Sequence, residues 1–182
     1  MGETSVNTNI ANTEAEDVLQ LVGFIVANEF FGVDILMVQE IIKNINITPI
    51  PDSPDFIEGV INLRGNIIPI IDLKKRLKLS GDQSVNSDEM WIVVLNISGR
   101  ITGFIVDRVT RVIKVSANAI RPAPELVVSG LKSDYIKGVT KHEQRLLVLL
   151  DFNRILLVEE FKKISAMKKS EASRSAEIGG LR

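Results

Sequence analysis

The sequence lacks cysteine altogether and has one histidine, one tryptophan and one tyrosine among its 182 residues. Without cysteine the chain has no disulfide, no thiolate metal ligand and no thiol nucleophile, which agrees with a reducing compartment. A single histidine leaves no group of imidazoles for a metal centre. Aromatic residues make up only 5% of the chain, which disfavours the aromatic-lined grooves that bind proline-rich peptides. We therefore expect neither a metal site nor a bound cofactor.

An excess of charge of one sign is also missing. The chain carries 22 basic and 23 acidic side chains and a net charge of −1. Without an overall positive field, it is not expected to attract the phosphate backbone of a nucleic acid. No apolar run approaches the roughly 18 residues that a membrane helix needs, and the first residues lack a signal-peptide pattern. We expect a cytoplasmic protein with no nucleic-acid partner and no membrane insertion.

What the chain does contain is apolar sequence, at 45% of residues with a mean hydropathy of +0.18. That is enough to build a core in one domain or two small ones. The polar segments 1–17 and 165–182 have little to bury and are expected to be disordered tails. The folded part is expected to span 18–164, ending in a helix over about 152–164.

Apolar runs between turn residues indicate a mainly β fold. The run Val18–Val26 is dense enough for a strand with both faces covered. A turn at Asn28-Glu29 leads to a second strand, whereas the spacing over Ile35–Ile42 predicts a turn or two of helix. A polar link, 80–88, follows the first group of strands. Further strands are predicted at 90–97, 102–106, 108–115, 135–139 and 145–150.

The segment Gly59–Leu73 is predicted to be a β-hairpin. Two apolar runs flank Arg64-Gly65-Asn66, where glycine and asparagine accept the positive φ angles of a tight turn. A rigid tip would present Arg64 to a partner in a fixed orientation. The alternative is that Arg64 is simply a solvated charge at a turn.

An internal repeat relates the two halves of the chain. Each half holds a glycine, an Ile-X-Pro-X-Pro corner, a second glycine and, thirteen positions later, an aspartate. The repeat predicts two similar units of about five short strands, and a closed barrel buries such strands without long edges. The hairpin tips differ, so the second unit is not expected to duplicate Arg64. The matching positions are Gly32, Ile47–Pro51, Gly59 and Asp72 in the first half and Gly103, Ile120–Pro124, Gly138 and Asp151 in the second.

No catalytic set emerges from the sequence. His142 lies in a polar turn, where we expect it to be solvated, whereas a general base is normally held by a third group in a dry pocket. Asp34, Asp72, Asp107 and Asp151 recur after strands, where a carboxylate accepts backbone N–H groups at a turn or helix start. We therefore expect a binding module and not an enzyme.

The sequence resembles the CheW family of bacterial chemotaxis coupling proteins over about residues 18–160. This resemblance implies two SH3-like five-stranded β-barrels side by side, with short helices and a C-terminal helix. The first barrel would span about 24–88, and the second would combine 18–23 with 89–151. Trp91 departs from the smaller aliphatic residue usual at its strand position. The matching segments are Phe31–Ile35, Val38–Ile41, Pro49–Pro51, Phe56–Gly65, Pro69–Leu73, Gly103–Val109, Ile120–Pro124 and Leu147–Asp151.

The resemblance also implies a role as a non-catalytic adaptor. Such a protein would join the cytoplasmic tips of chemoreceptors, the methyl-accepting chemotaxis proteins, to the regulatory domain of the histidine kinase CheA. It would act at the inner face of the membrane, within receptor arrays.

The receptor-binding groove that the resemblance implies comprises Val38, Glu40, Gly59, Arg64 and Val112. Arg64 would contact the receptor directly or shape the groove by pairing with Glu40. Gly59 would let a receptor helix approach the backbone closely. No motif assigns the residues that contact the kinase.

Overall fold

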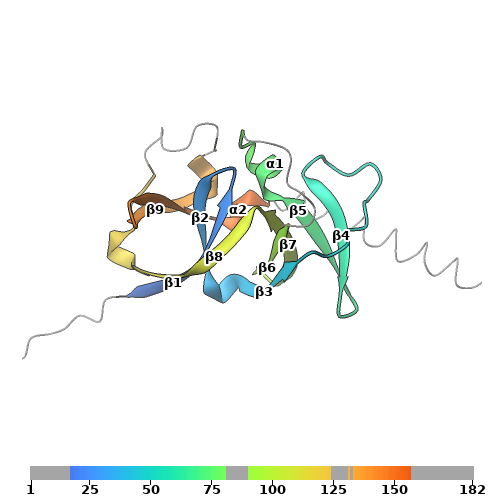
Figure 1. Ribbon diagram of the computed structural model, residues 1–182, viewed down its shortest axis with the longest axis horizontal. Coiled ribbons are helices and arrows are strands. Elements are labelled where there is room, and N and C mark those ends of the chain that lie inside the picture. The colour runs from blue at the N-terminus through green and yellow to red at the C-terminus, as the bar shows by residue number, and fades with distance from the viewer. Residues whose placement is uncertain (1–16, 81–89, 124–130, 132, 157–182) are drawn as a thin grey trace, which may run out of the picture.

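The structure of the protein is a computed structural model that describes residues 17–80, 90–123, 131 and 133–156. Its strands form two five-stranded sheets that lie side by side, with short helices between them (Figure 1). The predicted mainly β fold is confirmed. The terminal tails, the link 81–89 and the part of the predicted last helix beyond residue 156 lie outside the described residues.

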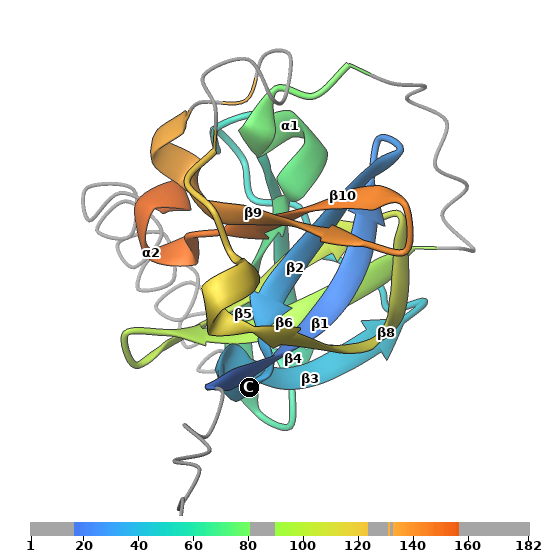
Figure 2. The same cartoon turned by 90° about the vertical axis from the view of Figure 1, so that its left-hand side faces the viewer.

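One sheet contains the first and last strands of the fold, and we call it the terminal barrel (Figure 2). Its strand order is β8-β1-β2-β10-β9, with β2 and β10 parallel and the other neighbours antiparallel. A bridge between Arg121 and Val139 joins the chain after β8 to β9, which closes the ring. The strands are β1 (Val18–Val26), β2 (Glu29–Asp34), β8 (Arg108–Ser116), β9 (Ile136–His142) and β10 (Arg145–Leu150).

The other sheet is formed by the middle of the chain, and we call it the central barrel. Its order is β3-β6-β7-β5-β4, with β5 and β7 parallel, and a bridge between Thr48 and Val60 closes it in the same way. The two barrels therefore share one topology, as the sequence repeat predicts. The strands are β3 (Val38–Lys43), β4 (Ile57–Leu63), β5 (Asn66–Asp72), β6 (Trp91–Ile97) and β7 (Arg100–Val106).

The strand pairing corrects the predicted division of the chain into barrels. The prediction placed 24–88 in one barrel and 18–23 with 89–151 in the other. Instead, the whole hairpin β1–β2 joins β8, β9 and β10, and the whole hairpin β6–β7 joins β3, β4 and β5. The two halves of the repeat thus exchange their first hairpins. A repeat in sequence shows which segments are alike, but it does not show which copy a hairpin pairs with.

The exchange creates one apolar cluster inside each barrel and a larger one that draws on both. On β1, Leu21 belongs to the core of the terminal barrel, whereas Val22 and Phe24 face the shared cluster. On β6, Ile92 and Val93 divide in the same way between the central barrel and the shared cluster. Because these strands are covered on both faces, they read as continuous apolar runs and not as alternating ones.

The shared cluster also contains the two short α-helices, α1 (Leu73–Leu77) and α2 (Phe152–Ile155). Arg76 on α1 donates from Nε to the carbonyl oxygen of Ile155, at 2.8 Å. Its guanidinium carbon lies 4.9 Å from the ring centroid of Phe56 and 5.3 Å from that of Tyr135. Arg76 therefore connects the helix of one barrel to the helix and a buried ring of the other.

The four strand-end aspartates accept backbone N–H groups, as predicted. Three of them begin helices, and Asp107 instead reaches the β1–β2 turn. The donor–acceptor distances are 2.9 Å for Leu36 N to Asp34, 3.0 Å for Lys75 N to Asp72, 3.1 Å for Asn153 N to Asp151 and 2.7 Å for Ala27 N to Asp107.

Two local predictions were wrong. Only Ile35–Met37 (η1) is helical, as a 3₁₀ turn, and Val38–Lys43 is the strand β3, because its β-branched residues pair with β6. The first hairpin turn is Ala27-Asn28 and not Asn28-Glu29. Trp91, which is partly buried, begins β6 beneath the ammonium of Lys43, at 5.1 Å from the ring centroid.

Candidate functional site

The predicted hairpin is formed by β4 and β5, and Arg64 lies at its tip. Arg64 and Gly65 have φ angles of 53° and 87°, the pattern of a type I′ turn, and glycine favours the second of these positions. Asn62 supports the turn by accepting a hydrogen bond from Gly65 N, at 2.9 Å. The Arg64 side chain is 80% exposed. The tip therefore holds a guanidinium away from the barrel on a rigid turn.

Glu40 on β3 fixes that guanidinium from the side. Its Oε1 atom lies 3.2 Å from Nη2 of Arg64, and the Glu40 side chain is 31% exposed. An exposed pair of this kind contributes about 0–1 kcal/mol to folding. Since a guanidinium has five N–H donors, the pair orients Arg64 and leaves donors for a partner. Direct contact with a partner and shaping of the surface are thus compatible roles for Arg64.

Gly59 allows a neighbouring segment of the same chain to pack closely against β4. Its φ is +147°, and a Cβ atom there would lie 2.1 Å from the carbonyl oxygen of Thr48. That carbonyl accepts a hydrogen bond from Val60 N at 2.9 Å, in the bridge that closes the central barrel. The expectation that Gly59 leaves room for a partner is therefore corrected, because the segment around Thr48 already fills that space.

The apolar members of the predicted groove differ in exposure. Val38 is half-buried and packs against the shared cluster, whereas Val112 on β8 is 49% exposed. Val112 belongs to the terminal barrel, and the other four predicted residues belong to the central barrel. The structure thus brings Glu40 and Arg64 into contact and places Val112 on the other sheet.

Leu36 is the apolar residue that the sequence analysis missed. It lies in η1, which contacts β1, and it is 86% exposed. Asp34 caps this turn through Leu36 N and so holds Leu36 outward. Its position in a run with apolar residues at helical spacing, Ile35–Ile42, concealed it, because that spacing predicts an amphipathic helix. The 3₁₀ turn between β2 and β3 exposes it.

A second ion pair lies at the tip of the matching hairpin in the terminal barrel. Glu143 holds the first position of the β9–β10 turn, as Arg64 does in β4–β5, and it pairs with Arg111 on β8. Arg111 and Glu40 both lie beside the irregularity in the edge strand of their barrel. The two tips therefore carry the same kind of ion pair with the charges reversed.

Titratable side chains in the described part of the chain do not form a metal site. Within those residues, no three His, Asp or Glu side chains are placed to hold a metal ion. His142 is half-buried and not fully solvated as expected; its ring centroid lies 6.3 Å from that of Phe30. Burial raises the pKa of Asp72, and a hydrogen bond to Glu58 raises the pKa of Lys75. These two groups form a helix cap and a surface ion pair, so structure accounts for both shifts.

None of the described helices has the length and apolar composition required to cross a bilayer.

Comparison with known proteins identifies the family. The family model described as the CheW-like domain matches residues 20–160. The chain is 43% identical to a chemotaxis protein CheW of Klebsiella aerogenes, over 81% of this chain and 87% of that protein. It is 35% identical to a chemotaxis protein CheW of Treponema pallidum, over 90% of this chain and 97% of that protein.

A solved structure matches the fold as well. The crystal structure of the scaffolding protein TtCheW from Thermoanaerobacter tengcongensis aligns with a TM-score of 0.70 and 35% identity, covering 78% of this chain and 90% of that one. Sequence, topology and fold thus agree that this chain belongs to the CheW family of chemotaxis proteins.

Proposed function

We propose that this protein is a non-catalytic chemotaxis scaffold that couples the cytoplasmic tips of chemoreceptors to the regulatory domain of the histidine kinase CheA. The identity with chemotaxis proteins CheW over most of the chain and the match to a CheW scaffolding protein support this role. The protein would act in the cytoplasm, at the inner face of the membrane within receptor arrays.

The observation that carries the receptor-binding part of the proposal is the exposed tip of the central barrel. Arg64 is held by Glu40 on a rigid turn, with donors free to bind a carboxylate or the carbonyl groups at a helix end. Leu36 and Val112 add exposed apolar surface that suits one face of an amphipathic helix. A receptor tip made of helices would offer both kinds of contact.

A scaffold of this kind works by position. Two separate binding surfaces on one rigid body raise the effective concentration of kinase near receptor, without any chemical step. The shared cluster between the barrels provides the rigidity, since both barrels contribute to it. A change in packing at one binding surface can then alter the affinity of the other.

The test is a set of three binding measurements with a receptor tip, the CheA regulatory domain and both together. We expect a ternary complex, and we expect Arg64→Ala and Arg64→Glu to weaken receptor binding by about 5–30-fold, or 1–2 kcal/mol. The stability of both variants should stay within about 1 kcal/mol of the parent.

Arg111→Ala is the matched control, because it removes the equivalent ion pair from the other barrel. It should leave receptor binding unchanged. Unaltered receptor binding by Arg64→Glu would refute the assigned site, and mutually exclusive binding of receptor and kinase would refute the scaffold role itself.

A further inference from the structure

One row of residues crosses the outward side of the central barrel, from β4 through β5 to β7 (Figure 1). Val60 pairs with Pro69, and the register of Ile70 with Gly103 places Thr102 beside Pro69. Their side chains point away from the interior of the barrel, because the residues next to them in the chain face its core. We call Val60, Pro69 and Thr102 the outer row. All three are buried, Thr102 completely and Val60 at 5% exposed.

The apolar clusters of the described residues do not account for this burial. Val60 belongs to none of the three clusters, and neither does Ile50, which follows the same closing bridge. Oγ1 of Thr102 is buried and has no hydrogen-bond partner within the described part of the chain, so what covers it there is not polar. In the terminal barrel, by contrast, the matching row lies inside the shared cluster. That row consists of Val139, Val148 and Phe31.

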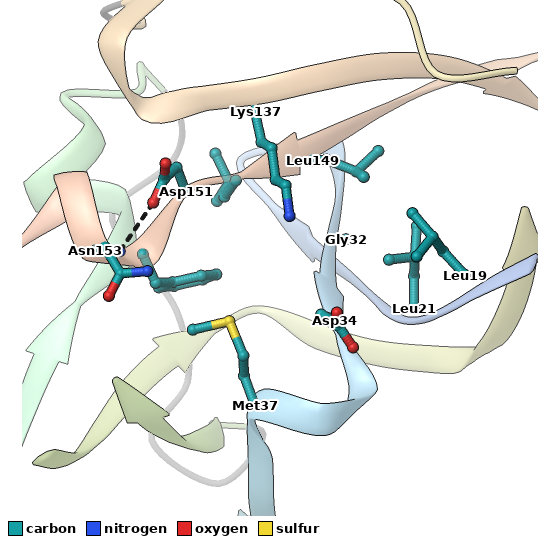
Figure 3. A pocket seen from close by; sticks show the side chains of 11 residues that line it. Leu19, Leu21, Gly32, Asp34, Met37, Lys137, Leu149, Asp151 and Asn153 are labelled. Atoms are coloured by element: carbon teal, nitrogen blue, oxygen red, sulfur yellow. Dashed lines mark hydrogen bonds between the residues drawn. The ribbon is translucent and has the colours of Figure 1, made fainter. Parts of the chain in front are cut away.

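The chain leaves the described residues close to the outer row. Asp151 caps α2 by accepting a hydrogen bond from Asn153 N at 3.1 Å, drawn beside the pocket at this end of the terminal barrel in Figure 3. The Asn153 side chain in turn accepts from Oγ of Ser98, in the β6–β7 turn, at 2.8 Å. Leu156 ends α2 with an extended backbone, at φ −108° and ψ 99°. The chain therefore turns at Leu156, next to the turn that leads into β7.

The sequence that follows has the pattern of an amphipathic helix. Leu157, Phe161 and Ile164 stand at positions i, i+4 and i+7, which share one side of a helix. Lys162 and Lys163 would fall on the opposite side. A helix of residues 157–167 would be about 16 Å long, at a rise of about 1.5 Å per residue. That length suffices to cross three strands, which lie about 4.8 Å apart.

We propose that residues 157–167 form an amphipathic helix that docks across β7, β5 and β4, with its apolar side against the outer row. Ile67, which is 44% exposed, lies two residues before Pro69 and extends the apolar surface on the same side of β5. Docking would close this surface to other proteins and brace the β4–β5 hairpin, whose tip carries Arg64. The inference goes beyond the proposed scaffold role and does not depend on it.

A spin label tests the docking directly, since the chain has no cysteine that would compete for the label. With a nitroxide on Lys163→Cys, at the polar side of the segment, we expect strong broadening of the amide signals of Val60 and Ile67. The signals of their counterparts in the terminal barrel, Val139 and Leu146, should be broadened much less. Equal broadening in both barrels, or none in either, would overturn the proposal.

A mixing experiment separates docking within one chain from docking between two copies. The labelled chain without isotope enrichment is added to an enriched chain without a label, so that only contacts between copies cause broadening. We expect no broadening at Val60 or Ile67 in this mixture. Broadening of the same strength as in the singly labelled chain would show that a second copy occupies the surface, which contradicts the proposal.

Two variants of the full-length chain test the apolar side of the segment. Phe161→Ser should shift the amide resonances of the outer row and remove the broadening by the label. Lys162→Ser, on the polar side, is the control and should do neither. In Phe161→Ser the amides of the β4–β5 hairpin should also exchange hydrogen about tenfold faster, while those of β9–β10 stay unchanged.

Equal resonance shifts in Phe161→Ser and Lys162→Ser, or unchanged exchange in β4–β5, would contradict the docking. These measurements use neither receptor nor kinase. A failure here would therefore leave the scaffold role untouched, and a failure of ternary assembly would leave the docking untouched.

Discussion

The two barrels have the same strand order and closure but opposite polar features. In each, a parallel pair of strands lies at the centre of the sheet order, and an isolated bridge joins the edges. At the hairpin tips, however, Arg64–Glu40 in the central barrel becomes Glu143–Arg111 in the terminal barrel. The comparison shows that the shared backbone tolerates reversed charges on its surface, so that one fold presents two electrostatically distinct faces.

Where the barrels meet, matching positions contact each other. Arg76 on α1 and Ile155 on α2 hold corresponding places in their helices, and the Arg76 side chain donates to the Ile155 carbonyl. Phe56 and Tyr135 precede corresponding strands, and the Arg76 guanidinium lies over both rings. The contact is therefore asymmetric, because the position on α2 that matches Arg76 is Ile155 and not a second arginine.

The largest expected effect on stability comes from the first residue of α1 and of α2, the helices that follow the matching strands β5 and β10. Phe152 on α2 and Leu73 on α1 hold the same place and are both buried, but Phe152 packs on Phe104 at 4.8 Å between ring centroids. We expect Phe152→Ala to cost about 3–5 kcal/mol of unfolding free energy, and Leu73→Ala about 1 kcal/mol less. Denaturant unfolding measures both values. A larger loss for Leu73→Ala would show that α1 and not α2 anchors the shared cluster.

The two barrel-closing glycines should also differ. Gly59→Ala strains a backbone at φ +147° and forces a methyl group against the Thr48 carbonyl, so we expect a loss of about 2–4 kcal/mol. At Gly138 the φ angle lies outside the left-handed region, and an added Cβ would lie 2.5 Å from Cγ2 of Ile120 and 3.1 Å from the Arg121 carbonyl oxygen, so its contact with backbone is less severe than at Gly59. Gly138→Ala should therefore cost about 1 kcal/mol. Equal melting temperatures for the two variants would contradict this account of Gly59.

The Arg76 connection is testable with a neighbouring control. Arg76→Met keeps much of the side-chain volume but removes the hydrogen bond and both ring contacts, which we expect to lower the unfolding free energy by about 1–3 kcal/mol. Lys75→Met on the same helix removes only an exposed ion pair and should change it by less than about 1 kcal/mol. If the two variants were equally stable, Arg76 would not connect the barrels energetically.

The smallest expected effect on stability comes from exchanging the charges of one tip. The double variant Glu40→Arg/Arg64→Glu gives the central barrel the charge order of the terminal barrel, and its stability should change by less than about 1 kcal/mol. Receptor binding, in contrast, should fall as for Arg64→Glu alone. Denaturant unfolding and a receptor pull-down measure the two effects. Full receptor binding by the double variant would show that the sign of charge at the tip does not matter.

Much of the fold and part of the site could be predicted from local sequence. The run Val18–Val26 indicated a strand covered on both faces, and Arg64-Gly65 indicated the exposed tip. The role of Gly59 could not be predicted, because glycine permits close approach by any chain, and only the fold shows that Thr48 approaches it. Leu36 was missed because one apolar residue in a short turn carries no periodicity that distinguishes exposed from buried.

The sequence by itself determined most of the strands and turns, the capping aspartates and the twofold repeat, since these depend mainly on residues that are neighbours in the chain. Only the tertiary structure decided that the first hairpin of each half pairs into the other half, which builds the shared cluster and sets Arg76 between two rings. The physical reason is that the two halves are similar in sequence, so each first hairpin could pair with the remaining strands of either half. The choice between them depends on packing across the whole molecule, which no local pattern records.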